Sequence, residues 1–224
     1  MAAAGAPDLS PRAARTRAAL IAAGFDLLAD RPIDAIPIDD VVARAGVAKG
    51  SFFNHFTDKQ DFAAAISAEV RREVEALVTA ANAAERDPLA RIAGGLQVAV
   101  RFALTQPKRS AVLLRGQGSS TARAHPLNRG LVADFEAALA QGLLRPAARD
   151  TGVLFWLGLC QVLMTNIVEQ KQDLAEAATR LAEMLVLGLT GLGVAPDRAA
   201  QLAQSAAREL LLTTRTAAPA ASIT

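Results

Sequence analysis

The sequence predicts an all-α fold. Alanine and leucine dominate the 224 residues, aromatic side chains make up only 4% of them, and tyrosine is absent, a composition that favours helices over strands. Apolar residues also recur three and four positions apart in successive segments, which is the period of an amphipathic helix. A chain of this length can bury a sizeable core in one or two domains.

The first predicted helix follows a small, polar N-terminus, residues 1–10, that we expect to be disordered. Ser10 can cap this helix, and Pro11 suits its first position. Arg31-Pro32 ends it. Its buried face would consist of Leu20, Ile21, Phe25, Leu27 and Leu28.

The stretch from Ile38 to Lys59 predicts two short helices joined by a tight turn. The first has one apolar face and stops at Gly46, a residue that readily takes the positive φ of a helix end. The second would run from about residue 48 to 56, with Phe52 and Phe56 buried on one face. The residues on or near its outer face are Lys49, Gly50, Ser51, Phe53, Asn54 and His55.

This outer face suits a DNA groove. Its polar ends can meet base edges and phosphates, and Gly50 lets the backbone come close. The alternative is an ordinary helical hairpin with a solvated face. Through Lys59 the chain has seven basic and seven acidic residues, without the basic surplus usual in a nucleic-acid module. Some basic residues nevertheless sit at helix starts, where they can gather on one side: Arg12, Arg15, Arg17, Lys49 and Lys59.

About a quarter of the chain resembles the TetR family of transcriptional regulators. The resemblance rests on AALIAAGFDLLAD at 18–30, IDDVVARAGV at 38–47, AKGSFFNHF at 48–56 and TDKQ at 57–60. It implies a three-helix helix-turn-helix DNA-binding domain at 11–57, in which the helix from Ala48 is the recognition helix. A helical effector-binding and dimerisation domain would follow at 58–212. We also expect Lys59, at a helix start, to touch phosphate.

Three residues depart from the family's pattern. Pro37 stands where the family usually has a Ser or Thr that caps the second helix and touches phosphate. Ala48 replaces a frequent Ser, and Phe53 replaces a frequent Tyr with a phosphate-binding hydroxyl. These losses imply weaker backbone contacts rather than another fold. They leave open a helical ligand-binding or scaffold protein whose head does not bind DNA productively.

The remaining segments also read as helices. Asp58 looks like the cap of a fourth helix that runs to about residue 84, with Asp61 in a box-like arrangement. A loop is expected at 116–123 and a disordered tail at 213–224. Further helices are predicted at 88–105, 107–115, 126–141, 152–172, 174–192 and 196–212.

An effector pocket is predicted among these helices, lined by Phe102, Trp156, Gln161 and Thr165. Gln161, Thr165 and Glu169 fall four apart on an apolar helix, either as an exposed or interfacial stripe or as the few polar groups of an apolar pocket. The acid-free stretch between Asp87 and Asp134 is either a solvated basic face or an attraction for an anionic effector or for DNA. Its basic residues are Arg91, Arg101, Lys108, Arg109, Arg115, Arg123 and Arg129.

A homodimer is predicted from the helices at 152–172 and 174–192, which are apolar around much of their circumference. Small residues would allow close helix approach, and an Arg at Leu185 or Leu189 would split the dimer. The alternative is that both helices form the monomer's core. The small residues are Gly158, Ala182, Gly188 and Gly191. The resemblance implies a repressor that binds a palindromic operator and is released by a small effector.

Several other classes are not expected. No phosphate-cradling loop, GxSxG, HExxH or CxxC motif is present, so we expect neither an enzyme, a cofactor nor a metal site. Cys160 is the single cysteine, which excludes an intramolecular disulfide. No signal peptide is recognisable. The longest apolar stretch, 153–168, is interrupted by polar residues and shorter than the roughly 20 residues of a membrane span. We expect a cytoplasmic protein.

Overall fold

The computed structural model describes residues 10–116 and 123–217. These residues form helices and turns without a strand, so the all-α prediction is confirmed. The predicted disorder of residues 1–9 and 218–224, and most of the loop at 116–123, lie outside the described residues. The chain divides after Glu69 into two compact units, which we call the head and the helical unit.

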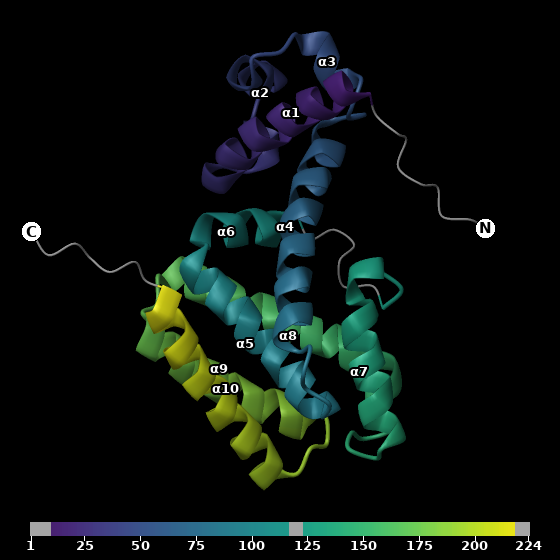
Figure 1. Ribbon diagram of the computed structural model, residues 1–224, viewed down its shortest axis with the longest axis vertical. Helices are drawn as coiled ribbons and strands as arrows, with labels where there is room; N and C mark the ends of the chain where they lie inside the picture. The colour runs from purple at the N-terminus through teal and green to yellow at the C-terminus, as the bar shows by residue number, and fades with distance from the viewer. Residues whose placement is uncertain (1–9, 117–122, 218–224) are drawn as a thin grey trace, which may run out of the picture. The chain divides into compact units, whose positions relative to one another are not determined.

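The head contains three complete helices, a 3₁₀ turn and the start of a fourth helix (Figure 1). As predicted, the Ser10 side chain accepts a hydrogen bond from the Ala13 N–H at 3.3 Å, with Pro11 in the first turn. The elements are α1 (Pro11–Asp30), η1 (Ile33–Ala35), α2 (Ile38–Ala45), α3 (Lys49–Phe53) and the first part of α4 (Lys59–Ala81).

An aromatic cluster fills the core of the head. Phe52 and Phe56 are buried, as predicted, with 0% and 3% of their surfaces exposed. Their ring centroids lie 5.1 and 4.8 Å from that of Phe62 on α4. A Cβ atom on Gly24 of α1 would lie 2.2 Å from the Phe62 ring, so a glycine is required there. The inner face of α3 therefore packs on this cluster. The outer face of α3 is not needed for packing within the head.

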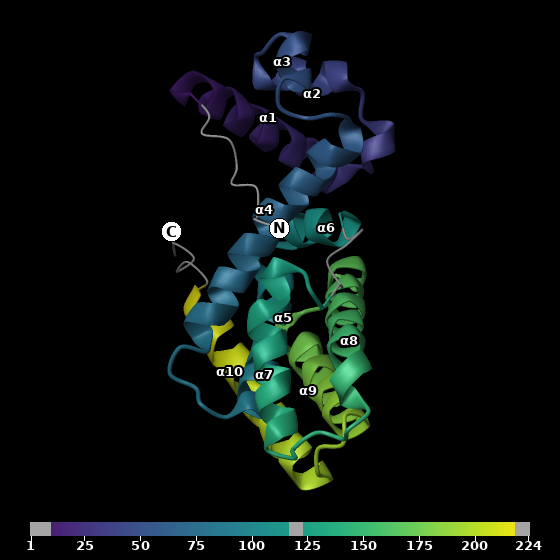
Figure 2. The same ribbon diagram turned by 90° about the vertical axis from the view of Figure 1, so that its right-hand side faces the viewer.

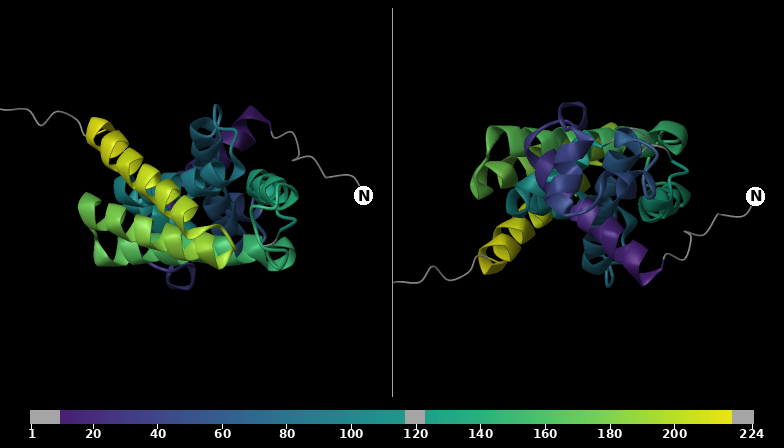
Figure 3. Two further views of the ribbon diagram at one scale, coloured as in Figure 1. Left: turned by 90° about the horizontal axis from the view of Figure 1, so that it is seen from below. Right: turned by 90° about the horizontal axis from the view of Figure 1, so that it is seen from above.

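The helical unit is built around α5 (Pro88–Thr105), which contacts every other complete α-helix of the unit (Figure 2). Most of its side chains are buried, and the Asp87 side chain caps it by accepting from the Leu89 N–H at 2.9 Å. Figure 3 shows α10 crossing α9 obliquely. The other elements are α6 (Pro107–Arg115), η2 (Pro126–Asn128), α7 (Arg129–Ala140), α8 (Ala148–Gln170), α9 (Leu174–Gly191), α10 (Pro196–Ala217) and the rest of α4.

Two helices of this unit extend beyond their predicted ends. α8 begins at Ala148 rather than Gly152, because Gly152 is a packing glycine and not a helix start: its Cβ would lie 2.9 Å from the Phe135 ring. α10 continues past Leu212 to Ala217, so the predicted disordered tail at 213–224 is wrong for residues 213–217, which are helical. In the head, α3 is shorter than predicted, although the Phe56 N–H still donates to the Phe52 carbonyl at 3.0 Å.

One described helix, α8, is long and apolar enough to span a membrane by length and composition alone. It packs against α5, α6, α7 and α9 within the helical unit. Those contacts account for one side of its apolar surface.

Candidate functional site

The turn between α2 and α3 sets the direction of α3. Gly46 ends α2 with a φ of 66°, in the left-handed region that favours glycine. The Val47 N–H then donates to the Val42 carbonyl at 3.0 Å, closing a Schellman-type helix end. This predicted turn is confirmed.

The outer residues of α3 and of the turn that follows it are open to solvent. Lys49, Gly50, Phe53 and Asn54 are exposed, while Ser51 and His55 are half-buried. Phe53 exposes 53% of its surface, which is unusual for a phenylalanine. A Cβ added at Gly50 would meet no atom within 4 Å, so another backbone can approach there. All six predicted DNA-facing residues are accordingly at least partly accessible.

Several basic side chains of the head are paired with carboxylates. Lys49 Nζ lies 2.9 Å from Asp39 Oδ1. Arg44 pairs with Asp26 at 2.8 Å, and Arg31 pairs with Asp40 at 2.9 Å. These exposed pairs explain why the head shows no basic surplus. They also mean that Lys49 must share its charge with Asp39 or turn away from it to reach another anion.

Lys59 has a structural role in the head. Its Nζ donates hydrogen bonds to the carbonyls of Asp34 at 3.1 Å and Ile36 at 3.0 Å, which ties the 3₁₀ turn to the start of α4. An ammonium group has three N–H donors, so these two bonds do not exhaust it.

The cap of α4 is the predicted one. The Asp58 carboxylate accepts from the Asp61 N–H at 2.8 Å, and the Asp61 carboxylate accepts from the Thr57 N–H at 2.9 Å. In contrast, Pro37 and Ala48 stand at the N-caps of α2 and α3 without a side-chain hydrogen bond. The N-termini of both helices thus lack the capping hydroxyls whose loss the sequence indicates.

The helical unit contains a cavity of about 130 Å³. Trp156 and Gln161 line it, as predicted, whereas Phe102 and Thr165 are not among its lining residues. Phe102 is instead buried in the packing of α5. The apolar walls include Val74, Val78, Ile92, Leu113, Trp156 and Met164.

Two ion pairs stand in the wall of this cavity. On α4, Arg71 Nε lies 3.1 Å from Glu75 Oε1, and Arg71 Nη2 donates to Asn128 Oδ1 at 2.6 Å. Neither Arg71 nor Glu75 was identified from the sequence, although their spacing of four residues is typical of a helical ion pair. Burial raises the pKa of Glu75, and the nearby charge of Arg71 lowers it by less. A desolvated carboxylate with a single close cation therefore faces the cavity.

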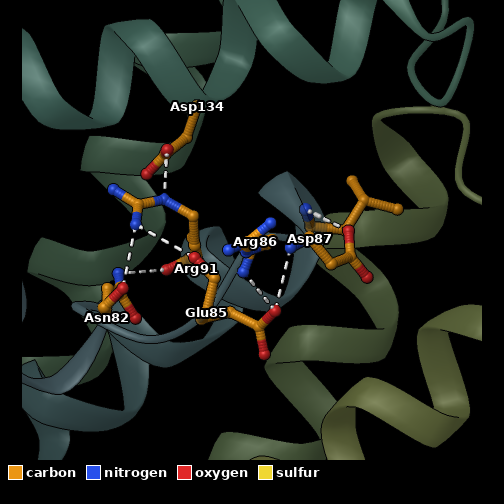
Figure 4. A network of polar contacts seen from close by, with 7 residues as sticks. Asn82, Glu85, Arg86, Asp87, Arg91 and Asp134 are labelled. Atoms are coloured by element: carbon orange, nitrogen blue, oxygen red, sulfur yellow. Dashed lines mark hydrogen bonds and ion pairs between the residues drawn. The ribbon is translucent and has the colours of Figure 1, made fainter.

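The second pair belongs to a network at the end of α4 (Figure 4). Arg91 of α5 lies with its Nε 2.6 Å from Asp134 Oδ1 of α7. Its Nη1 donates to the Asn82 carbonyl at 2.9 Å, and Asn82 Nδ2 donates back to the Arg91 carbonyl at 3.0 Å. Through these bonds Arg91 joins α4, α5 and α7. Its positive charge also lies at the C-terminal end of α4, where a cation is favourable.

The acid-free basic segment is partly neutralised by acids from other helices. Besides Arg91, Arg109 pairs with Glu73 of α4 at 2.5 Å and Arg123 pairs with Glu136 of α7 at 2.7 Å. Arg91, Arg109 and Arg123 therefore form neither a uniformly solvated basic face nor a patch of unpaired cations, the two alternatives that the sequence left open. Their partners are distant in sequence or lie beyond the segment, so its local charge gave no hint of them.

Cys160 faces the same cavity, and burial raises its pKa to about 12. The thiol is therefore protonated at neutral pH and lacks the thiolate character of a reactive cysteine. Among the described residues, no cluster of His, Cys, Asp and Glu that could hold a metal ion occurs.

A second feature of the helical unit is an apolar surface on α8 and α9. Leu187 exposes 67% of its surface, whereas Leu185 and Leu189 expose none. Gly188 faces Leu159 and Trp156 within the unit. The two leucines suggested from sequence are therefore core residues, because positions two apart on a helix point to opposite sides. The exposed apolar face consists of Leu154, Phe155, Val162 and Leu187.

Together, the open helix-turn-helix and the separate cavity-bearing unit define a helical regulator with a DNA-binding head. Residues 20–66 match the family model described as "Bacterial regulatory proteins, tetR family". The head therefore resembles the DNA-binding domain of tetR-family regulators over these residues.

Two curated relatives match part of the chain. The HTH-type transcriptional regulator YwcC of Bacillus subtilis is 45% identical over 42 residues, and the transcriptional regulator AcuR of Cereibacter sphaeroides is 34% identical over 62 residues. The matches span only 19% and 28% of the relatives' lengths.

The fold also resembles that of solved structures with low sequence identity to this chain. The structure of RolR in complex with resorcinol superposes with a TM-score of 0.59 at 21% identity, covering 86% of this chain and 94% of RolR. At this identity the likeness concerns the fold.

Proposed function

We propose that this protein is a transcriptional repressor that binds a palindromic operator as a homodimer and is released by a small effector. The open outer face of α3 on a TetR-type head carries the proposal most directly. The cavity and the exposed apolar face of the helical unit support its two other parts.

In the DNA-bound state, α3 enters the major groove. Lys49, Ser51 and Asn54 read base edges, while Gly50, Phe53 and His55 lie close to the backbone. The accessibility of these residues, of which Ser51 and His55 are half-buried and the others exposed, supports this assignment. Lys59 contacts phosphate with the donor that its two carbonyl bonds leave, so its loss should lower the salt slope of binding by about one unit.

The dimer forms through the apolar face of Leu154, Phe155, Val162 and Leu187. Phe155 lies beside α9, since a Cβ at Gly191 would be 3.7 Å from its ring, so the α8 and α9 residues belong to one surface. An exposed face of this kind commonly marks an interface. Pairing it with its symmetry mate gives a four-helix interface, which for an obligate dimer buries roughly 2,000 Å² or more. Two heads then match half-sites about 34–36 Å apart.

Release by an effector requires two states that the effector distinguishes. Arg71, Val74, Glu75 and Val78 of α4 line the cavity, and the same continuous helix begins in the head at Lys59. A ligand that favours a tilted α4 changes the spacing of the two recognition helices. The typical coupling in such systems is about 1–3 kcal/mol. RolR, which shares the fold, was solved with resorcinol, in line with a small-molecule effector.

A gel shift with the DNA just upstream of the protein's own gene tests this function. We expect a salt-dependent shift that a scrambled duplex does not give, and loss of the shift when the right effector is added. The competing function is a ligand-binding or scaffold protein with a non-productive head, which the uncapped N-termini at Pro37 and Ala48 favour. Equal affinity for operator and scrambled duplex would support that alternative.

A further inference from the structure

The cavity of the helical unit restricts the size of what it can hold. Its volume of about 130 Å³ is close to the roughly 150 Å³ of an engineered apolar cavity that binds benzene. A single six-membered ring with one or two small substituents fits this volume, and two fused rings exceed it. Trp156, which exposes only 1% of its surface, supplies an aromatic wall for such a ring.

The charges of the cavity wall cancel within the wall itself. Arg71 is neutralised by Glu75 at 3.1 Å, and Arg91 by Asp134 at 2.6 Å. Among the described lining residues these two pairs hold all the formal charges, so their sum is zero. An anionic or cationic ligand would bring an uncompensated charge into a partly desolvated space, which is unfavourable. The charge balance therefore selects an uncharged ligand.

Two polar groups of the wall remain to orient this ligand. Gln161 lines the cavity, and its side-chain amide carries both a donor and an acceptor. The Glu75 carboxylate has one close cation and accepts further hydrogen bonds. A hydroxyl group satisfies both residues, because it donates to a carboxylate and accepts from an amide.

We propose that the effector class of this cavity is an uncharged, single-ring molecule with a hydroxyl group, held against Trp156 and hydrogen-bonded to Gln161 and Glu75. This inference rests on the proposed function insofar as the ligand is called an effector. It differs from the anionic effector that the basic segment suggests, because Arg91 is paired within the wall.

Calorimetric titration of the full-length protein without DNA tests the ligand class. The probes are phenol, toluene, benzoate, benzylammonium and 2-naphthol, which vary the hydroxyl, the charge and the size separately. We expect phenol to bind at least tenfold more tightly than benzoate, benzylammonium or 2-naphthol. Tighter binding of either charged probe, or no binding of phenol, would overturn the proposal.

A variant pair isolates the orienting group. Gln161→Leu removes the amide, so phenol should bind about tenfold more weakly while toluene binding is unchanged. Gln201→Leu makes the same change at an exposed position of α10 and serves as the matched control. Equal phenol affinity in wild type and Gln161→Leu would exclude the hydrogen bond on which the proposed class depends.

The gel shift separates this inference from the proposed function. If phenol binds with the expected pattern but the protein does not recognise operator, the ligand class holds and the repressor function fails. If benzoate binds more tightly and releases operator, the repressor function holds and the ligand class fails.

Discussion

At the scale of single residues, several basic side chains of the head form ion pairs with carboxylates. DNA must compete with these carboxylates for the basic side chains. Lys49 is the clearest case, since its ammonium lies 2.9 Å from Asp39 on an exposed surface. Exposed pairs of this kind are worth little, about 0–1 kcal/mol, so a phosphate or guanine can displace the carboxylate. The pairing therefore tunes affinity rather than blocking binding.

Loss of the base-reading side chains should weaken operator binding. Lys49→Ala and Asn54→Ala each remove a contact from α3, at an expected cost of about 1–3 kcal/mol and with relaxed preference at one base position. Arg44→Ala, which removes an exposed cation from α2, is the control in a fluorescence anisotropy titration. If Lys49→Ala and Asn54→Ala both bind as tightly as wild type, α3 is not the recognition helix.

Removal of the carboxylate beside Lys49 should have the opposite effect. Asp39→Asn frees the ammonium and removes a negative charge near the phosphates, so operator affinity should rise about two- to fivefold. Asp26→Asn changes the charge equally but frees Arg44. The same anisotropy titration should show a smaller gain for this control. An equal gain would mean that only the net charge matters.

Cys160 should behave as a half-buried, desolvated thiol. Its pKa is raised to about 12, above the ordinary 9.0, so the folded state holds the proton where the unfolded state loses it. Stability is therefore full below pH 9 and should fall as pH rises from 9 towards 12. At pH 7.5, a thiol reagent should react with the native protein much more slowly than with the urea-unfolded protein. Equal rates in both states would show that the thiol is not desolvated.

Some residue roles were predictable from sequence and others were not. The caps Ser10 and Asp58, the left-handed Gly46 and the buried Phe52 depend on local chemistry, which the sequence displays directly. The two carbonyl bonds of Lys59 and the pairing of Arg91 with Asp134 are contacts between residues 23 to 43 positions apart. No local pattern indicates such contacts.

At the scale of elements, the end of α4 is held by a single arginine. Arg91 bonds carbonyls after α4 and the Asp134 carboxylate of α7, and both polar partners are largely buried. Arg91 therefore fixes the corner where α4, α5 and α7 meet, and Figure 4 shows it between Asn82 and Asp134.

Breaking this corner should destabilise the helical unit. Asp134→Asn leaves the partly buried Arg91 without its counter-ion, at an expected cost of about 1–3 kcal/mol in the free energy of unfolding. Glu136→Gln on the same helix breaks the exposed pair with Arg123 and should cost less than about 1 kcal/mol. Urea denaturation followed by circular dichroism measures both. Equal losses would mean that the Arg91 network is not a structural corner.

The order of the helices was predictable, but two ends were not. Proline and aspartate mark the starts of α5 and α10 in the sequence itself. Gly152 gives no such indication, because a glycine that ends a helix and one that packs under a phenylalanine look alike in sequence. Only the packing of α7 against α8 distinguishes them.

At the scale of the whole molecule, the proposed function depends on a dimer. One short recognition helix reads few base pairs, so two must be held at a fixed separation. The sequence indicates α8 and α9 as the dimerisation helices but not which side of each faces out, since both are apolar around much of their circumference. Burial then distinguishes core Leu185 from exposed Leu187.

Sedimentation of wild type and Leu187→Arg in the presence of labelled operator tests whether dimerisation and operator binding depend on the same apolar face. We expect wild type to sediment at twice the chain mass at micromolar concentration and to carry the operator. Leu187→Arg should sediment as a folded monomer and lose operator binding, while Leu212→Arg, an equally exposed leucine on α10, should do neither. A wild-type monomer that still protects a palindromic site, or a monomeric Leu187→Arg that binds it unchanged, would contradict the account.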